Sequence, residues 1–229
     1  MQISIKTLCF YLFFYLSNNL VGQTPNPLID KKNIFDQQRW VDSIYSKLSL
    51  EEKVGQLFMP MVFTERDSSH FHFTLNLIKK YKVGGLVFSL GGPVEQTKWL
   101  NAFQRESKVP LMTAMDAEWG VAMRLDSVMP FPWPMTLGAI KDSTLLRKIG
   151  KRMGMQEKRL GIHYSFGPTL DINTNPKNPI IGNRSYGSSP DRVIRQALAI
   201  MKGHQEAGIL TSGKHFPGHG DTQKDSHLT

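Results

Sequence analysis

The residues best suited to chemistry lie in the last stretch of the sequence, positions 214–227. Its fourteen residues include three His, two Asp and two Lys, separated by Gly and Pro. Side chains of these types resist full burial unless they are paired, so the segment is poor material for a core. It directly follows an apolar run, 208–213, which we interpret as a short buried strand. Because α/β proteins place their sites at the carboxyl ends of strands, we expect a functional site here.

The end of this segment offers acid/base chemistry. In the run Asp225-Ser226-His227, an Asp stands close enough in sequence to orient the His imidazole and to stabilise its protonated form. An imidazole with a pKa near neutrality can give and take a proton, typically worth ~10²–10⁴-fold in rate. His227 and Asp225 are therefore candidate catalytic residues, and a solvated turn is the simplest alternative.

Metal binding is another interpretation of the same segment. His215, His219, Asp221 and His227 carry nitrogen and oxygen ligands, and the spacing of the first two resembles a zinc motif on a helix. Pro217 and the neighbouring glycines prevent a regular helix there, so the two imidazoles need not converge. We therefore predict no metal and no other cofactor.

Polar residues elsewhere in the chain stand in comparable positions. Asp116 directly follows the apolar run 109–115, and Lys214 with His215 follows the last apolar run. A charged pair that emerges from a buried strand must find partners. Arg184 lies in a long polar loop, where a guanidinium can bind a carboxylate or sugar hydroxyl groups. From the residues alone, Asp116 is equally a helix N-cap, and Arg184 equally stabilises its own loop.

The elements that would position these residues alternate between apolar strands and amphipathic helices. Strands are predicted at 55–63, 83–88, 109–115, 162–166 and 208–213. Helices are predicted at 36–53, with Ser49 capping a short helix from residue 50, and at 73–81, 95–107, 143–160 and 190–206. No Gly-rich dinucleotide motif follows the first strand, and polar clusters end nearly every strand. The pattern predicts an α/β fold of the (β/α)₈ TIM-barrel type, incomplete because about five of the eight units can be counted.

The amino end has the order of basic, apolar and small polar residues that is typical of a secretory signal peptide. Lys6 precedes an apolar block at 8–16 that is too short to span a bilayer, and we place the cleavage near Gly22. We predict three segments: a signal peptide at 1–22, a leader with the first helix at 23–47, and a partial barrel domain at 48–229. The protein is expected to be periplasmic or secreted, without stable membrane insertion after cleavage; a membrane anchor or buried amino-terminal helix is the alternative. Cys9 lies in the removed segment, which leaves neither disulfides nor a thiol nucleophile.

The chain is basic, with 28 Lys and Arg against 19 Asp and Glu. Such a balance raises the question of nucleic acid as a partner. The basic residues are scattered over predicted helices and do not interleave with aromatic residues, so we expect no nucleic-acid binding. Weak attraction to an anionic polymer such as a cell wall stays open.

Four motifs together resemble family 3 glycoside hydrolases, particularly the β-N-acetylglucosaminidase branch. The longest is Lys-His-Phe-Pro-Gly-His-Gly-Asp-Thr-Gln-Lys-Asp-Ser-His at 214–227. The others, in matching order, are Asp-Ala-Glu-Trp-Gly at 116–120, Gly-Pro-Thr-Leu-Asp-Ile-Asn at 167–173 and Asn-Arg-Ser-Tyr-Gly at 183–187. The likeness extends from residue 48 to the end of the sequence.

The resemblance implies a (β/α)₈ barrel and a retaining double displacement on a glycan with β-linked N-acetylglucosamine. It implies that His227, paired with Asp225, is the acid/base, where other glycosidases use a carboxyl group. It implies contacts with sugar hydroxyl groups for Asp116, Arg184, Lys214 and His215. Glu118 and Asp171 match the motifs, but we do not expect them to touch the substrate.

Two departures from the family pattern stand out. Trp119 replaces the Gly of many relatives and predicts a different neighbour for the sugar site. The family's nucleophile, an Asp after a later strand, has no counterpart in the sequence, so we expect an amino-terminal fragment that is inactive by itself. The alternatives are a β-glucosidase-like hydrolase of the same family, against which the Asp-Ser-His run argues, and a non-catalytic sugar-binding fragment.

Overall fold

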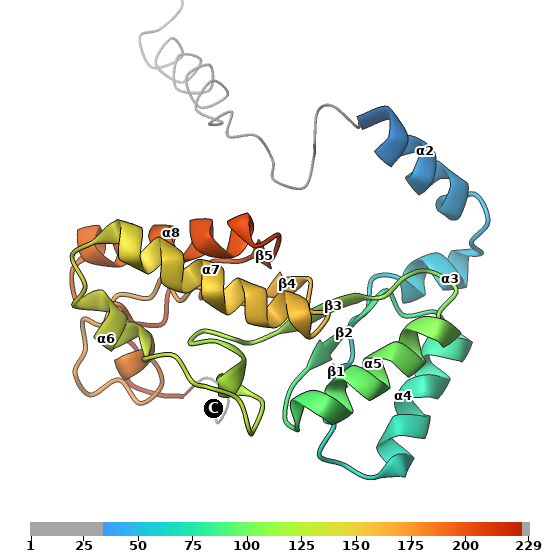
Figure 1. Cartoon of the computed structure of the whole chain (residues 1–229), viewed down its shortest axis with the longest axis horizontal. Helices are drawn as coiled ribbons and strands as arrows, with labels where there is room; N and C mark the ends of the chain where they lie inside the picture. The colour runs from blue at the N-terminus through green and yellow to red at the C-terminus, as the bar shows by residue number, and fades with distance from the viewer. Residues whose placement is uncertain (1–33, 226–229) are drawn as a thin grey trace, which may run out of the picture. The chain divides into compact units, whose positions relative to one another are not determined.

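Five short strands form one parallel sheet in the computed structural model, which describes residues 34–225 (Figure 1). They are β1 (Met61–Val62), β2 (Gly85–Phe88), β3 (Met112–Met115), β4 (Tyr164–Ser165) and β5 (Leu210–Thr211), and they lie side by side in chain order. One register row crosses the sheet through Val62, Phe88, Met115, Ser165 and Thr211. Sequential parallel strands joined by helices are the topology of a (β/α)₈ barrel. The predicted fold class is therefore confirmed, with a barrel that does not close within residues 34–225.

The strands alternate with helices that begin at signals in the sequence. The helices are α2 (Ile34–Tyr45), α3 (Leu50–Gly55), α4 (Ser68–Tyr81), α5 (Pro93–Glu106), α6 (Pro134–Gly138), α7 (Ser143–Arg159) and α8 (Pro190–Glu206), with the 3₁₀ turns η2 (Val121–Met123) and η3 (Gly182–Arg184). Asp142 accepts hydrogen bonds from two backbone N–H groups at the start of α7. Asp67 caps α4 by accepting a hydrogen bond from the Ser69 backbone N–H, and α4 therefore begins five residues before the predicted position 73.

The predicted strand at the start of the sheet is wrong in extent, and the helix before it begins where it was predicted. The predicted strand 55–63 is a strand only at β1, because α3 continues to Gly55 and a turn follows it. Ser49 and Glu52 form a capping box, in which each side chain accepts a hydrogen bond from the other residue's backbone N–H. This box starts α3, which confirms the prediction that Ser49 caps a short helix from residue 50, and the rest of the predicted helical stretch 36–53 is the separate helix α2. The later strands lie within their predicted ranges but are shorter.

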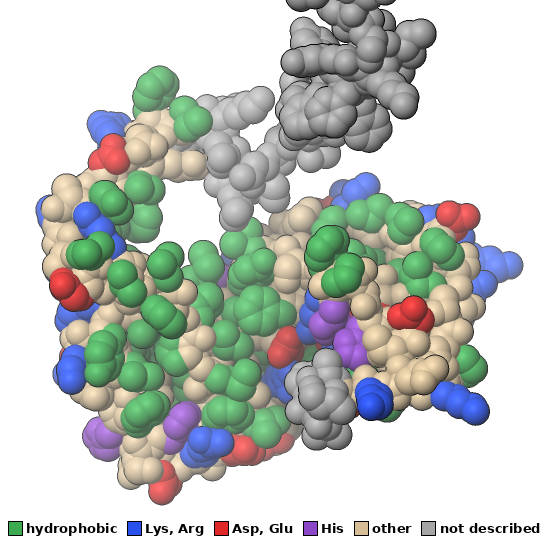
Figure 2. Space-filling model, turned by 180° about the vertical axis from the view of Figure 1, so that it is seen from behind, with side chains coloured by type: hydrophobic (Ala, Val, Ile, Leu, Met, Phe, Trp, Pro, Cys, Tyr) green, Lys and Arg blue, Asp and Glu red, His purple; other side chains and the backbone are tan. Residues whose placement is uncertain are grey.

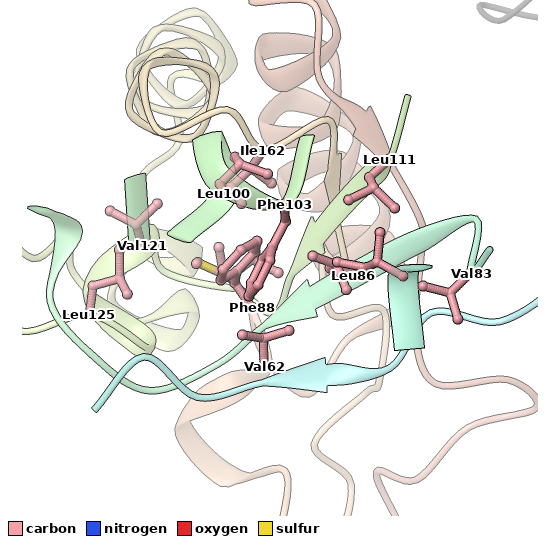
Figure 3. Close-up of a cluster of buried hydrophobic side chains, with 13 residues drawn as sticks. Val62, Val83, Leu86, Phe88, Leu100, Phe103, Leu111, Val121, Leu125 and Ile162 are labelled. Atoms are coloured by element: carbon pink, nitrogen blue, oxygen red, sulfur yellow. The ribbon is translucent and has the colours of Figure 1, made fainter. Parts of the chain in front are cut away.

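One hydrophobic core lies between the first strands and helices α4 and α5 (Figure 3). Leu86 and Phe88 of β2 meet Phe103 of α5 in this core, and all three side chains are almost fully buried. Burying a side chain of this size contributes about 1.5–3 kcal/mol. Met115, the last residue of β3, belongs to the same core, which fixes the point where the next residue, Asp116, leaves the sheet.

A second core joins α6, α7 and α8, and Figure 1 shows α7 and α8 lying along each other. Two glycines allow this close approach. A Cβ on Gly150 of α7 would come within 2.3 Å of the Ile200 carbonyl oxygen, and one on Gly203 of α8 within 2.2 Å of the Arg147 carbonyl oxygen. Tyr186, two residues after Arg184, is buried in this core and ties the loop before α8 to the helices.

The chain divides into two compact units, Met1–Val41 and Asp42–Thr229, and the sheet belongs to the second. The predicted signal peptide at 1–22 lies outside the described residues, as do Ser226 and His227. The predicted boundaries at 23–47 and 48–229 stay predictions. In the described part of the chain, every helix is too short or too polar to cross a membrane.

Candidate functional site

Asp116 lies directly after β3, at the carboxyl end of the sheet, and binds two cations. Its Oδ2 accepts a hydrogen bond of 2.7 Å from Arg124, and its Oδ1 accepts one of 2.7 Å from Lys214 Nζ. Burial raises the pKa of Asp116, but hydrogen bonds and charges from Lys214 and Arg124 lower it more, so the pKa lies below its ordinary value. The side chain is therefore an ionised acceptor held between cations.

Glu118, two residues further along, is fully buried and holds Arg184. Arg184 donates from Nε and Nη2 to the two carboxylate oxygens at 2.9 and 2.7 Å, which makes a bidentate pair. Burial raises the pKa of Glu118, but Arg184 and Lys214 outweigh this effect and leave the pKa below its ordinary value. The hydrogen bond to Glu118 in turn raises the pKa of Arg184. The loop residue Arg184 is thus fixed by a carboxylate 66 residues earlier in the chain.

Lys214, after β5, joins the two carboxylates. Its Nζ lies 2.7 Å from Asp116 Oδ1 and 2.8 Å from Glu118 Oε1, and its side chain is only 17% exposed. We call the five linked side chains the ion cluster: Asp116, Glu118, Arg124, Arg184 and Lys214. Three cations against two carboxylates leave it with a net charge of +1.

Asp171 fixes His215 beside the ion cluster. Its buried Oδ2 accepts a hydrogen bond of 3.1 Å from the His215 backbone N–H and lies 2.6 Å from His215 Nδ1. A carboxylate at Nδ1 favours the tautomer with the proton on that nitrogen. His215 Nε2 then faces Arg184 Nη2 at 3.4 Å as an acceptor. Asp171 Oδ1 also accepts a hydrogen bond from the backbone N–H of His219, which shapes the loop after β5.

This loop is held further along by Asn178. Its Nδ2 donates to the His219 carbonyl oxygen at 2.7 Å and to the Thr222 carbonyl oxygen at 3.1 Å. A hollow of about 420 Å³ lies between the segments 170–174 and 213–221 and is lined in part by Asp171, Lys214 and His215. The site therefore has an open space beside fixed polar groups.

The structure brings the four predicted binding residues together. Asp116, Arg184, Lys214 and His215 lie in one connected network, although they come from three separate stretches of sequence. Glu118 and Asp171 lie behind them with fully buried side chains, where they orient the others. The predicted catalytic pair of Asp225 and His227 stays a prediction, because His227 lies outside the described residues. Asp225 is half-buried at the end of the loop.

Two features of the site were not predicted from the sequence. Arg124 completes the ion cluster from an irregular segment eight residues after Asp116, and no pattern in the sequence marks it. Trp119 stacks on Trp133 with ring centroids 4.2 Å apart and ring planes 13° from parallel. The sequence marks Trp119 as a departure from the Gly of the family, but no pattern in it indicates that Trp133 is the stacking partner.

A larger hollow, of about 650 Å³, is apolar and lies elsewhere. It is formed around α3 and α4 and is lined by Leu50, Val54, Phe58, Leu77, Tyr81 and Val83, among others. Figure 2 shows hydrophobic side chains gathered over the half of the molecule that holds these helices. This hollow has none of the ion-cluster residues in its lining, so it is separate from the candidate site.

The ion cluster suits the recognition of a ligand with many hydroxyl groups. Carboxylate oxygens accept, and guanidinium and ammonium groups donate, hydrogen bonds that are strengthened by charge. Because the charged groups already hold one another in place, little side-chain entropy is lost when a ligand binds. In the described part of the chain, no three His, Cys, Asp or Glu side chains are grouped to hold a metal ion.

The fold and the cluster define a barrel protein with a polar site at the carboxyl ends of its strands. Residues 49–229 match the family described as "Glycosyl hydrolase family 3 N terminal domain", and the chain belongs to this family. It is 35% identical over 164 residues to beta-hexosaminidase A of Pseudoalteromonas piscicida, a match that covers 66% of this chain and 27% of that protein.

Solved structures of the same family are similar in fold. A family 3 β-N-acetylglucosaminidase from Paenibacillus sp. strain FPU-7 matches with a TM-score of 0.71 and 38% identity, over 79% of this chain and 35% of that one. The beta-glucoside phosphorylase BglX bound to 2FGlc matches with a TM-score of 0.77 and 28% identity, over 88% of this chain and 35% of that one. The chain thus spans about a third or less of the length of these relatives.

Proposed function

We propose that this chain contributes the amino-terminal part of the barrel in a retaining β-N-acetylglucosaminidase. The enzyme would remove terminal β-linked N-acetylglucosamine from peptidoglycan-type or related glycans in the periplasm or outside the cell. The observation that carries the proposal is the ion cluster, in which Lys214 joins Asp116 to Glu118 at the carboxyl ends of the strands. The hexosaminidase and acetylglucosaminidase relatives support this sugar over others.

In this proposal, three residues of the ion cluster and the neighbouring His215 bind the sugar ring. Asp116 accepts hydrogen bonds from ring hydroxyl groups, Arg184 and Lys214 donate to them, and His215 Nε2 accepts. Their positions are preset by Glu118 and Asp171, so the ring would be held in one orientation before the reaction begins. Contacts that strengthen as positive charge develops on the ring lower the barrier rather than only the dissociation constant.

The bond-breaking step would follow the two-displacement scheme of retaining glycosidases. An Asp from a later part of the barrel attacks the anomeric carbon while His227 gives its proton to the glycosidic oxygen, which leaves with the bonding electrons. Water then attacks the same carbon, His227 takes the water's proton, and the Asp leaves. Asp225 would orient the imidazole and stabilise its protonated form.

Hydrolysis of an aryl β-N-acetylglucosaminide tests the proposal. This chain is assayed beside the full-length protein that its gene encodes. Activity in the longer form alone is the expected result, because the nucleophile is expected outside residues 1–229. Activity of the short chain would refute the claim about the nucleophile, and activity in neither form would favour a sugar-binding role, testable by titration with N-acetylglucosamine.

A second candidate activity is phosphorolysis, which the fold similarity to the beta-glucoside phosphorylase favours. A neutral imidazole at the acid/base position does not repel an incoming phosphate, whereas a carboxylate would. In that case inorganic phosphate replaces water in the second displacement, and the product is N-acetylglucosamine 1-phosphate. Product analysis with and without phosphate separates the two activities, and a parallel assay with an aryl glucoside tests the β-glucosidase alternative.

A further inference from the structure

The stacked pair of Trp119 and Trp133 has no role in the chemistry above. The two rings are nearly parallel, at 4.2 Å between centroids. Trp119 is half-buried, while Trp133 is 45% exposed. The Trp133 ring therefore packs on Trp119 and still has surface in contact with solvent. Contact with Trp119 limits the orientations open to the Trp133 ring, which makes it a preset flat surface.

Each tryptophan is connected to the ion cluster through a neighbouring residue or element. Trp119 directly follows Glu118, whose carboxylate holds Arg184 and Lys214. Trp133 is the N-cap of α6, and α6 packs against η3, which ends at Arg184. Trp119 is therefore next to the cluster in sequence, and Trp133 is linked to it through the packing of α6 against η3.

Close packing also fixes the segment that carries Trp133. Gly120, with a φ of +85°, lies so near Phe131 that a Cβ there would come within 2.8 Å of its ring. Phe131 packs on the second core, and Pro134 is buried. The segment 131–134 thus lies against the loop after β3, and Trp133 cannot move away from this loop without breaking these contacts.

The chemistry of the surface indicates its ligand. An indole face carries negative charge density, and the C–H groups on one face of a pyranose ring are weakly positive and apolar. The ion cluster is suited to hydroxyl groups, so it holds the sugar that is cleaved off. We propose that the Trp119–Trp133 pair is a stacking surface for the next sugar of the glycan, on the leaving-group side, and that it selects oligosaccharides over simple glycosides. This inference rests on the proposed glycosidase function.

The test compares two substrates with similarly poor leaving groups, methyl β-N-acetylglucosaminide and N,N′-diacetylchitobiose. In the full-length protein, Trp133→Ala is expected to lower the ratio of kcat/KM for the disaccharide to kcat/KM for the methyl glycoside by about 3- to 10-fold. Trp133→Phe keeps an aromatic face and should give an intermediate ratio. Trp40→Ala on α2 is the matched control and should leave the ratio unchanged, while circular dichroism verifies that each variant folds.

An unchanged ratio in Trp133→Ala would overturn the inference and leave the proposed function intact. If the wild-type protein cleaves neither substrate, the proposed function fails, and calorimetric titration with N,N′,N″-triacetylchitotriose decides the inference separately. Binding that weakens 3- to 10-fold in Trp133→Ala would still support the stacking surface. Binding that is absent, or equal in both proteins, would refute it.

Discussion

Replacing Lys214 by Met tests whether the ion cluster holds the molecule together. The substitution keeps the apolar stem but removes two charge-assisted hydrogen bonds, of 2.7 and 2.8 Å, from Asp116 and Glu118. Each such bond contributes about 1.5–3 kcal/mol. Both carboxylates keep an arginine, so the penalty of about 3–5 kcal/mol for breaking a buried pair is an upper limit. We expect Lys214→Met to lower the free energy of unfolding by about 3 kcal/mol at pH 7.

The effect should depend on pH with a defined sign. The native pKa values of Asp116 and Glu118 lie below their ordinary values of 3.8 and 4.5, so their ionised forms stabilise the native state above those values. This contribution is lost as the pH falls through the native pKa values. The difference between the wild type and Lys214→Met should therefore be largest at neutral pH and narrow below about pH 4.

Urea unfolding followed by far-UV circular dichroism at pH 7 and pH 3.5 measures both effects. Lys98→Met is the matched control, because Lys98 pairs with Glu95 on the surface with a side chain that is 65% exposed. A surface pair of this kind contributes about 0.5 kcal/mol or less. If Lys214→Met costs no more than this control, or costs the same at both pH values, Lys214 does not stabilise the native state through its bonds to Asp116 and Glu118.

Three further predictions follow from other contacts. His227→Ala should slow the full-length enzyme by about 10²–10⁴-fold, more for poor leaving groups that need protonation, as measured on aryl glycosides of different leaving-group pKa. His204 is buried against Glu157, with its Nε2 3.4 Å from Glu157 Oε1; burial lowers the pKa of His204, but the interaction with this carboxylate raises it more, so the pKa lies above its ordinary value. His204→Gln should therefore cost more stability at pH 6 than at pH 9, since the contribution of the charged form is lost as the pH rises through the native pKa. Gly150→Ala should lower the free energy of unfolding by about 1–3 kcal/mol, because its Cβ would meet the Ile200 carbonyl oxygen.

Each of these predictions has an outcome that would contradict it or a matched control variant. Equal slowing of all leaving groups would exclude His227 as the general acid. His72→Gln changes an exposed His and should show no pH-dependent loss, and a similar profile in both variants would contradict the role of the buried pair. Gly92→Ala places a Cβ at an ordinary distance of 3.4 Å from Asp126 and should cost less than Gly150→Ala in thermal unfolding.

The sequence predicted the alternation of elements because strands and helices differ in apolar period, and it predicted Asp116 and Lys214 as strand-end residues. It did not predict the start of the sheet, where the apolar residues of 55–63 continue a helix and a turn before β1 begins. The contact between Asp116 and Lys214 spans 98 residues and depends on how neighbouring strands align. No local pattern encodes such a pairing. Arg124 was missed for a different reason: it is only eight residues from Asp116, but it lies in an irregular segment that no periodic pattern marks.

The order of the strands has a consequence for synthesis. Since β1 to β5 lie side by side in chain order, the sheet can grow at one edge as the chain leaves the ribosome. The acidic half of the ion cluster is made first, and Lys214 follows Asp116 by 98 residues. At about 5–20 residues per second, these residues take roughly 5–20 s to synthesise. Arg184 follows Glu118 by 66 residues, so until Arg184 is made Glu118 has neither cation beside it, and an unpaired carboxylate is kept hydrated rather than buried. Lys214 is made last of the five residues and joins the two carboxylates, so its synthesis completes the ion cluster at this edge of the sheet.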